Sequence, residues 1–163
     1  MQITVSHVDH AETYRERLSP SLWVLAAAGG AAPMVALVFA PVDTTLALVA
    51  GALVGVAVIA LLVLASPVLE VAEGELRAGR AHIEVSLLGA PQVLAGEPAR
   101  LARGQDLDPR CWHVIRGGID GIVSIPVLDP VDPAPAWVLS SRTPDRLAAA
   151  VRRAQVRRST PSR

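Results

Sequence analysis

Two carboxylates close together in the sequence are the first residues that could do chemistry. Asp129 and Asp132 lie in the proline-rich segment "DPVDPAPAW", which ends at Trp137. Two such groups could hold a cation or orient a basic partner. Aspartate before proline is also ordinary turn chemistry, and the segment contains no third or fourth acidic ligand. We therefore expect an interaction surface made by Asp129, Asp132 and Trp137 rather than a metal site.

The single cysteine, Cys111, rules out an intramolecular disulfide. It stands beside Trp112 and His113, an order that could suggest a thiolate–imidazole pair. Consecutive residues of a strand point to opposite faces, so their order gives no reason for contact, and we expect a structural cysteine. The four histidines lack zinc-type spacing: His7, His10, His82 and His113.

No other motif supports catalysis. Ser140 and Ser141 have no nucleophile-elbow context, and "GGIDG" lacks the strand–glycine–helix order that cradles phosphate. We expect a protein that is not an enzyme and that carries no cofactor and no metal.

Arginine is concentrated at the C-terminal end, where residues 142–163 contain seven arginines and one acidic residue, Asp145. We take four of the seven as candidate interaction residues: Arg142, Arg146, Arg152 and Arg153. A basic helix at an anionic membrane surface gains ~1 kcal/mol per basic residue held there. A solvated helix face explains the same pattern equally well. Nucleic acid is not expected as a partner, because no aromatic residues are interleaved with the arginines.

Two uncharged apolar stretches predict membrane spans at about 22–40 and 44–65. Only Pro41, Val42 and Asp43 separate them, which leaves room for nothing but an antiparallel hairpin. Asp43 is placed to cap the second helix. A cleavable signal peptide is disfavoured because a second full span follows at once, and the remaining chain is too short to bury both helices in a soluble core.

Arginine placement predicts the orientation of the hairpin. Arg15 and Arg17 precede the first span, Arg77 and Arg80 follow the second, and the connecting turn has none. The positive-inside rule then puts both termini in the cytoplasm of a multi-pass cell-membrane protein. With Arg15 and Arg17, Trp23 is expected to act as a membrane anchor at the cytoplasmic interface.

Small residues in the second span predict close helix packing. Gly51 and Gly55 form a GxxxG spacing that lets another helix approach. Packing against the first span at Ala26, Gly29 or Gly30 is favoured over dimerisation.

After Pro67 short β-type segments replace the apolar stretches. We expect strands at 68–73, 75–77, 81–85, 87–94, 112–116, 121–127 and 136–140, with a brief helix at 97–103. Thr143 is a predicted N-cap and Pro144 the first residue of a helix that runs to about Arg157. The fold class is thus a membrane α-helical hairpin followed by a small antiparallel β barrel or sandwich with a C-terminal helix, which is similar in element order to the pleckstrin-homology-like architecture. Expected parts are a cytoplasmic segment at 1–20, the hairpin at 21–66, the β domain at 67–158 and a disordered tail at 159–163.

Three segments resemble an uncharacterised family of small actinobacterial two-span membrane proteins, a domain of unknown function: "YRERLSPSLW", "LRAGRAHIEV" and "DPVDPAPAWVLSSRTPDRLAAAV". The similarity runs from about Tyr14 to Ala154. One departure is Ala136, where the family pattern implies an aromatic residue. The resemblance implies the membrane topology and no activity.

Two functions follow as hypotheses, and a third, less favoured one is an enzyme, which would require a pocket with converging polar groups. The first is a membrane-tethered, non-catalytic interaction module at the inner membrane surface, with lipids and a membrane or cytoplasmic protein as partners. The second is an accessory subunit of a larger membrane assembly, or a homo-oligomer, docking through Gly51 and Gly55.

Overall fold

The computed structural model describes residues 13–159, in two compact units. One unit comprises residues 17–67 and 116–119, and the other comprises the remaining described residues. His7, His10 and tail residues 160–163 lie outside the described residues. Residues 116–119 belong with the hairpin because Gly118 lies against Ser21 and because the Arg116 guanidinium donates to the carbonyl oxygen of Ala65 at 3.3 Å.

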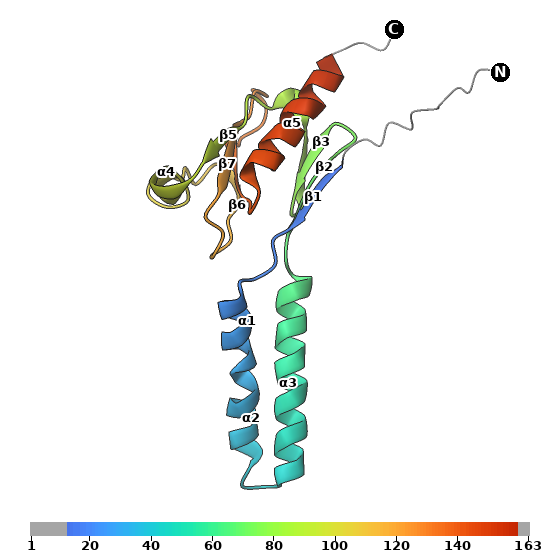
Figure 1. Ribbon diagram of the computed structural model, residues 1–163, viewed down its shortest axis with the longest axis vertical. Coiled ribbons are helices and arrows are strands. Elements are labelled where there is room, and N and C mark those ends of the chain that lie inside the picture. Colours follow the sequence, from blue (N-terminus) through green and yellow to red (C-terminus); the bar gives the residue numbers. More distant parts are fainter. Residues whose placement is uncertain (1–12, 160–163) are drawn as a thin grey trace, which may run out of the picture. The chain divides into compact units, whose positions relative to one another are not determined.

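The first unit is a helical hairpin made of α1 (Leu22–Gly29), α2 (Ala31–Phe39) and α3 (Thr44–Leu64) (Figure 1). Both the stretch Leu22–Phe39 and α3 are long and apolar enough to cross a membrane. The apolar stretch predicted at about 22–40 is helical from Leu22 to Phe39, with a break at Gly30 between α1 and α2. Pro33 has no backbone N–H to offer the carbonyl of Gly29, so the chain is weakest there.

The turn between α2 and α3 has the predicted cap. An Asp43 carboxylate oxygen accepts from the backbone N–H of Leu46 at 2.7 Å. Asp43 has extended backbone angles and its own carbonyl accepts from Ala47, as expected of an N-cap residue. The turn therefore positions α3 through local chemistry alone.

Gly51 and Gly55 face α2. A Cβ at Gly51 would lie 2.6 Å from the carbonyl oxygen of Ala32, and one at Gly55 would lie 2.9 Å from the Ala32 Cβ. The stripe packs against the first span as predicted, but at Ala32 and Ala36 of α2 rather than at Ala26, Gly29 or Gly30. The position of the turn explains this, because a hairpin that turns at residues 40–43 places residue 51 opposite Ala32.

Four strands form the first sheet of the other unit: β1 (Tyr14–Arg17), β2 (Val68–Ala72), β3 (Glu75–Ala78) and β4 (Ala81–Glu84), in that spatial order. The β2–β3 and β3–β4 pairs are antiparallel, joined by turns with positive φ at Gly74 and Gly79. The sequence predicted β2 to β4 but missed β1, which lies in the segment at 1–20 for which no strand was predicted.

The second sheet has the order β5–β7–β8–β6, formed by β5 (Gln92–Leu94), β7 (Ile122–Pro126), β8 (Ala136–Ser140) and β6 (Trp112–Val114). The prediction of an entirely antiparallel domain was wrong, because β6 pairs with β8 in parallel, with Trp112 opposite Trp137. The expected strand at 87–94 is instead a 3-10 turn, η1 (Val85–Leu87), followed after Pro91 by the short β5.

Two helices complete the second unit, α4 (Gly96–Ala102) and α5 (Pro144–Ser159). The buried face of α5, centred on Leu147 and Val151, packs against η1, β2, β5 and β7 and so touches both sheets. Among the described strands no pairing joins the outer strands of one sheet to those of the other, so the barrel is not closed. The arrangement is two open sheets bridged by a helix.

Candidate functional site

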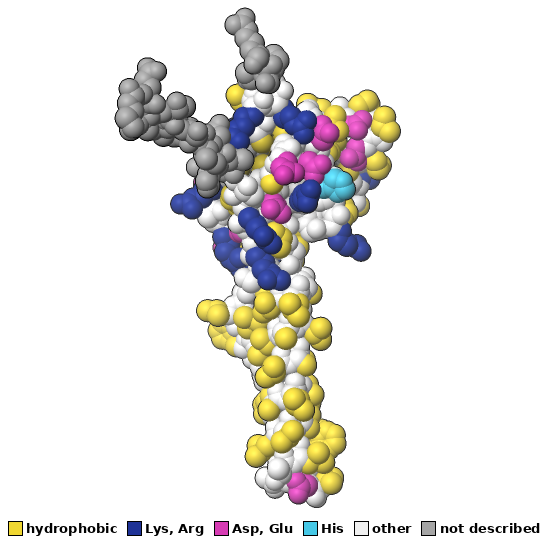
Figure 2. All heavy atoms as spheres, turned by 90° about the vertical axis from the view of Figure 1, so that its right-hand side faces the viewer, with side chains coloured by type: hydrophobic (Ala, Val, Ile, Leu, Met, Phe, Trp, Pro, Cys, Tyr) yellow, Lys and Arg dark blue, Asp and Glu magenta, His cyan; other side chains and the backbone are white. Residues whose placement is uncertain are grey.

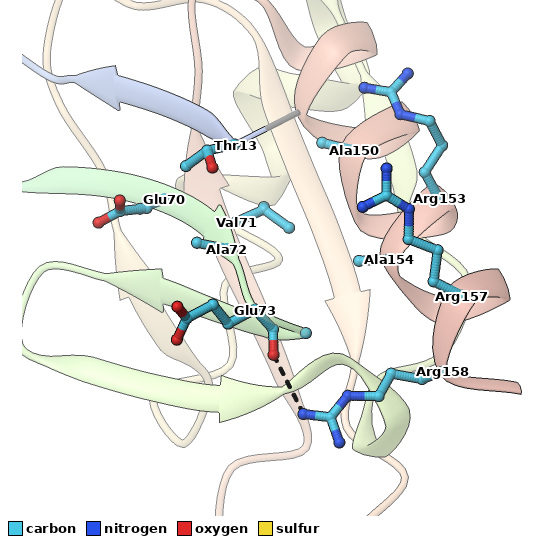
Figure 3. Close-up of a pocket in the computed structure, with 11 residues that line it drawn as sticks. Thr13, Glu70, Val71, Ala72, Glu73, Ala150, Arg153, Ala154, Arg157 and Arg158 are labelled. Carbon is cyan, nitrogen blue, oxygen red and sulfur yellow. Dashed lines mark hydrogen bonds between the residues drawn. The ribbon is translucent and has the colours of Figure 1, made fainter. Parts of the chain in front are cut away.

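A hollow between α5 and β2 combines apolar and basic side chains (Figure 3). Its volume is about 540 Å³. Val71 points from β2 toward Ala150 and Ala154 of α5, which form an apolar floor. Arg153 and Arg157 extend along the rim on the helix side. We call this hollow the basic groove.

The helix supplies the basic rim because its two faces differ. Leu147, Ala148, Ala150 and Val151 are buried, and five of the remaining positions of α5 are arginine. Alanine at 150 and 154 keeps the floor open, since a larger side chain there would fill the space. The pattern of residues that packs one face of α5 against the sheets therefore also places small and basic residues along the groove.

Charge is distributed unequally across the basic groove. Arg157 forms no hydrogen bond or ion pair with any residue that the structure describes. Glu70 and Glu73 lie on the opposite wall, but their carboxylates point away from the arginines (Figure 3). With the two carboxylates directed elsewhere, the groove favours an anionic ligand.

Arg158 closes one end of the basic groove. Its guanidinium donates to the Glu73 carbonyl oxygen at 3.2 Å and covers Gly74. Gly74 has φ +80°, and a Cβ there would collide with the guanidinium. The positive φ therefore favours glycine at this turn, and a side chain there would displace the Arg158 guanidinium.

A polar network fixes β1 beside the start of α5. One Glu16 carboxylate oxygen accepts from the hydroxyls of Tyr14 and Ser141, each at 2.6 Å. The other accepts from the backbone N–H of Arg142 at 2.8 Å. The Tyr14 hydroxyl also lies 3.0 Å from that of Thr143, and Thr143 N–H donates to the Ser141 hydroxyl. Burial, and then the Glu16 carboxylate, raise the pKa of Tyr14.

The sequence did not predict this network, although residues 14–16 and 141–143, which form it, both lie in the segments that resemble the family. The alternation in "YRER" places Tyr14 and Glu16 on one face and Arg15 and Arg17 on the other. Ser141 is completely buried, which a serine tolerates only with hydrogen-bond partners. Only long-range contact joins the segments, so no local signal could pair them.

The candidate interaction residues do not form one surface. Asp129 and Asp132 cap their own turns, accepting from the backbone N–H groups of Val131 and Ala134. Trp137 is only 3% exposed, so it offers almost no area to a partner. Arg152 donates to the Pro91 carbonyl oxygen and ties α5 to the chain before β5. Arg142 contributes its backbone N–H to the Glu16 network.

Asp132 and Trp137 do meet at a second hollow, of about 560 Å³, lined also by His82, Cys111 and Trp112. The two indole rings are tilted, with centroids 6.2 Å apart. Burial raises the pKa of the Cys111 thiol, which disfavours the thiolate. His113 contacts the backbone carbonyl of Cys111 rather than its sulfur. Within residues 13–159 no three His, Cys, Asp or Glu side chains gather as a metal site.

The predicted anchors are exposed. Trp23 is 85% exposed on α1, as expected of a residue that has no protein partner to pack against. Arg15 and Arg17 occupy exposed positions of β1.

The fold and the groove define a chain with two apolar, span-length helices and a separate β-rich unit that carries a basic groove. The family model described as "Protein of unknown function (DUF3093)" matches residues 13–151, and the chain belongs to this family. The match confirms the predicted membership of an uncharacterised family. No curated protein and no solved structure matches the chain.

Proposed function

We propose that the chain is a membrane-inserted, non-catalytic interaction module, with the hairpin crossing the cell membrane twice and the β-rich unit in the cytoplasm. In this proposal the hairpin confines the β-rich unit to the inner membrane surface. Tethering raises the local concentration of a binding surface without adding any contact.

The exposure of the hairpin carries the proposal. Neither α1 nor α2 has a buried residue, and in α3 only Ala47, Gly51 and Gly55 are buried. Hydrophobic side chains cover the visible face of the hairpin (Figure 2). Among them, Leu37 is 73% and Leu53 is 66% exposed. An apolar surface of this extent is unfavourable in water and favourable in lipid. At ~1.5 Å per residue, α3 measures roughly the ~30 Å of a hydrocarbon core.

Charge within the hairpin unit supports the orientation. The turn carries Asp43, whereas Arg17 precedes α1 and Arg116 binds the last turn of α3 through the Ala65 carbonyl. A guanidinium at a helix C-terminus satisfies a carbonyl and complements the helix dipole. Arginines at the open end of the hairpin and none in the turn favour a cytoplasmic open end.

Docking of another helix on Gly51 and Gly55 is less well supported, because Ala32 and Ala36 of α2 already contact that stripe. A ligand for the β-rich unit is better supported, since the basic groove has an apolar floor and a guanidinium with no partner among the described residues.

Cysteine labelling of the intact chain in cells tests the proposal. In a Cys111→Ser background, Val42→Cys places a thiol in the turn, and Ser86→Cys places one at an exposed position of η1. A membrane-impermeant maleimide should label position 42 in intact cells and position 86 only after permeabilisation. Extraction of the protein by alkaline carbonate, or the opposite labelling pattern, would overturn the proposal.

A further inference from the structure

The basic groove continues into a neighbouring hollow along the same helix. That hollow, of about 560 Å³, is lined by β1 and by Asp145, Arg146 and Ala149 of α5. The two share Thr13 and Arg153 among their lining residues. The hollow surface therefore follows α5 for most of its length.

The length of this surface argues against a single small anion. Arg146 and Arg157 are eleven residues apart on the helix, which corresponds to ~16 Å at 1.5 Å per residue. One phosphate or carboxylate group cannot contact both. An extended chain of about five residues, at ~3.3 Å each, spans the same distance.

The spacing of Arg153 and Arg157 matches that of alternate residues in an extended chain. Arg153 and Arg157 are one helical turn apart, ~6 Å along the axis. Alternate residues of an extended peptide point to the same side at intervals of ~6.6 Å. Carboxylates two residues apart would thus meet Arg153 and Arg157, while the alanine floor leaves room for small side chains. Arg146 lies seven residues before Arg153, ~10.5 Å along the axis, which is about three residues of an extended chain.

We propose that this surface binds an extended acidic segment of a partner protein, with glutamate or aspartate at alternate positions opposite Arg153 and Arg157 and a further acidic side chain reaching Arg146. The inference rests on the proposed function, since it names the partner of the interaction module. Arg146 and Arg157 are available for such a ligand, because neither has a hydrogen bond or an ion pair with a described residue. On the helix side of the surface Asp145 is the one acidic lining residue of the described chain.

The test measures binding of labelled octapeptides to the full-length chain in nanodiscs of zwitterionic lipid. The peptides carry glutamate at every second, third or fourth position, with alanine between, and each has a glutamine counterpart. The variant is Arg146→Gln with Arg157→Gln. The matched control is Arg80→Gln, an exposed arginine of the β3–β4 turn that lines neither hollow and has no partner among the described residues.

The alternate-glutamate peptide should bind best, and its glutamine counterpart should not bind. Each substitution should weaken binding by about threefold, as for partly exposed ion pairs, and the double variant by about tenfold. Arg80→Gln should leave the affinity unchanged. Equal affinity for every glutamate spacing, an unweakened double variant, or no binding of any peptide overturns the inference.

A lipid occupant is distinguished in the same preparation. Vesicles containing anionic phospholipid are added, and their association with the nanodisc-bound protein is measured. If the double variant weakens vesicle association while no peptide binds, the surface binds lipid and the inference is wrong. Labelling at positions 42 and 86 in the same variants reports separately on the proposed topology, so the two failures cannot be confused.

Discussion

Removing the Glu16 carboxylate should destabilise the β-rich unit more than removing any exposed carboxylate. Glu16→Ala deletes three hydrogen bonds, from Tyr14, Ser141 and the backbone of Arg142. A hydrogen bond to a charged group contributes about 1.5–3 kcal/mol, but the contributions of one network are not additive. Water can also reach the half-exposed Glu16. We therefore expect a loss of about 2–3 kcal/mol rather than the full sum.

The assay is urea unfolding of the full chain in detergent, followed by tryptophan fluorescence. Of the three tryptophans, Trp23 lies in the hairpin, and a Trp23→Phe background leaves Trp112 and Trp137 to report on the β-rich unit alone. Glu16→Gln keeps one acceptor oxygen and should cost about 1 kcal/mol.

Glu97→Ala is the control. Glu97 pairs only with the exposed Arg100, three residues along α4, so its loss should cost less than about 0.5 kcal/mol. If Glu16→Ala proves no more destabilising than Glu97→Ala, the network does not stabilise the fold. A double-mutant cycle with Ser141→Ala then measures how much of the effect passes through the buried hydroxyl.

Three further predictions concern other sites. Gly51→Leu should destabilise the hairpin toward SDS by about 1–3 kcal/mol, because the new side chain would meet the Ala32 backbone, whereas the exposed neighbour Ala52→Leu should have little effect. The raised pKa of Tyr14 means that the unfolded chain loses this proton first, so stability should fall above pH ~10 and the fall should shrink in Tyr14→Phe. The raised pKa of Cys111 predicts slow alkylation at pH 8, well behind an exposed Ser86→Cys thiol, and comparable rates would refute it.

The sequence was informative wherever structure depends on local chemistry. The α3 boundaries, its Asp43 cap, the start of α5 after Thr143 and the strand Ala136–Ser140 were all predicted within a residue. Each has a local signal, such as a capping side chain, a proline at the first helical position or a run of apolar residues.

Features that depend on long-range pairing could not be predicted. The parallel pairing of β6 with β8 is set by neighbouring strands and not by the three residues of β6. The four residues of β1 are held by β2 and by Ser141, which lies 125 positions away from Glu16. The sequence identified the arginines of α5 as candidate binding residues. It did not indicate that Val71 of β2 faces this helix or that the Glu70 carboxylate points away from the arginines (Figure 3), because both depend on how β2 packs in the folded sheet.

The Glu16 network and the binding surface share structural elements, which constrains how variants must be interpreted. Thr13 and the first residue of β1, Tyr14, line the hollow that contains Arg146, and the same Tyr14 is held by Glu16. Loosening β1 should therefore change the shape of the surface as well as the stability of the unit. Arg157 takes no part in the network, so its substitution should weaken peptide binding and leave the unfolding midpoint unchanged. A variant that lowers both the peptide affinity and the unfolding midpoint acts by loosening β1. A variant that lowers the peptide affinity alone acts by removing a positive charge from the binding surface.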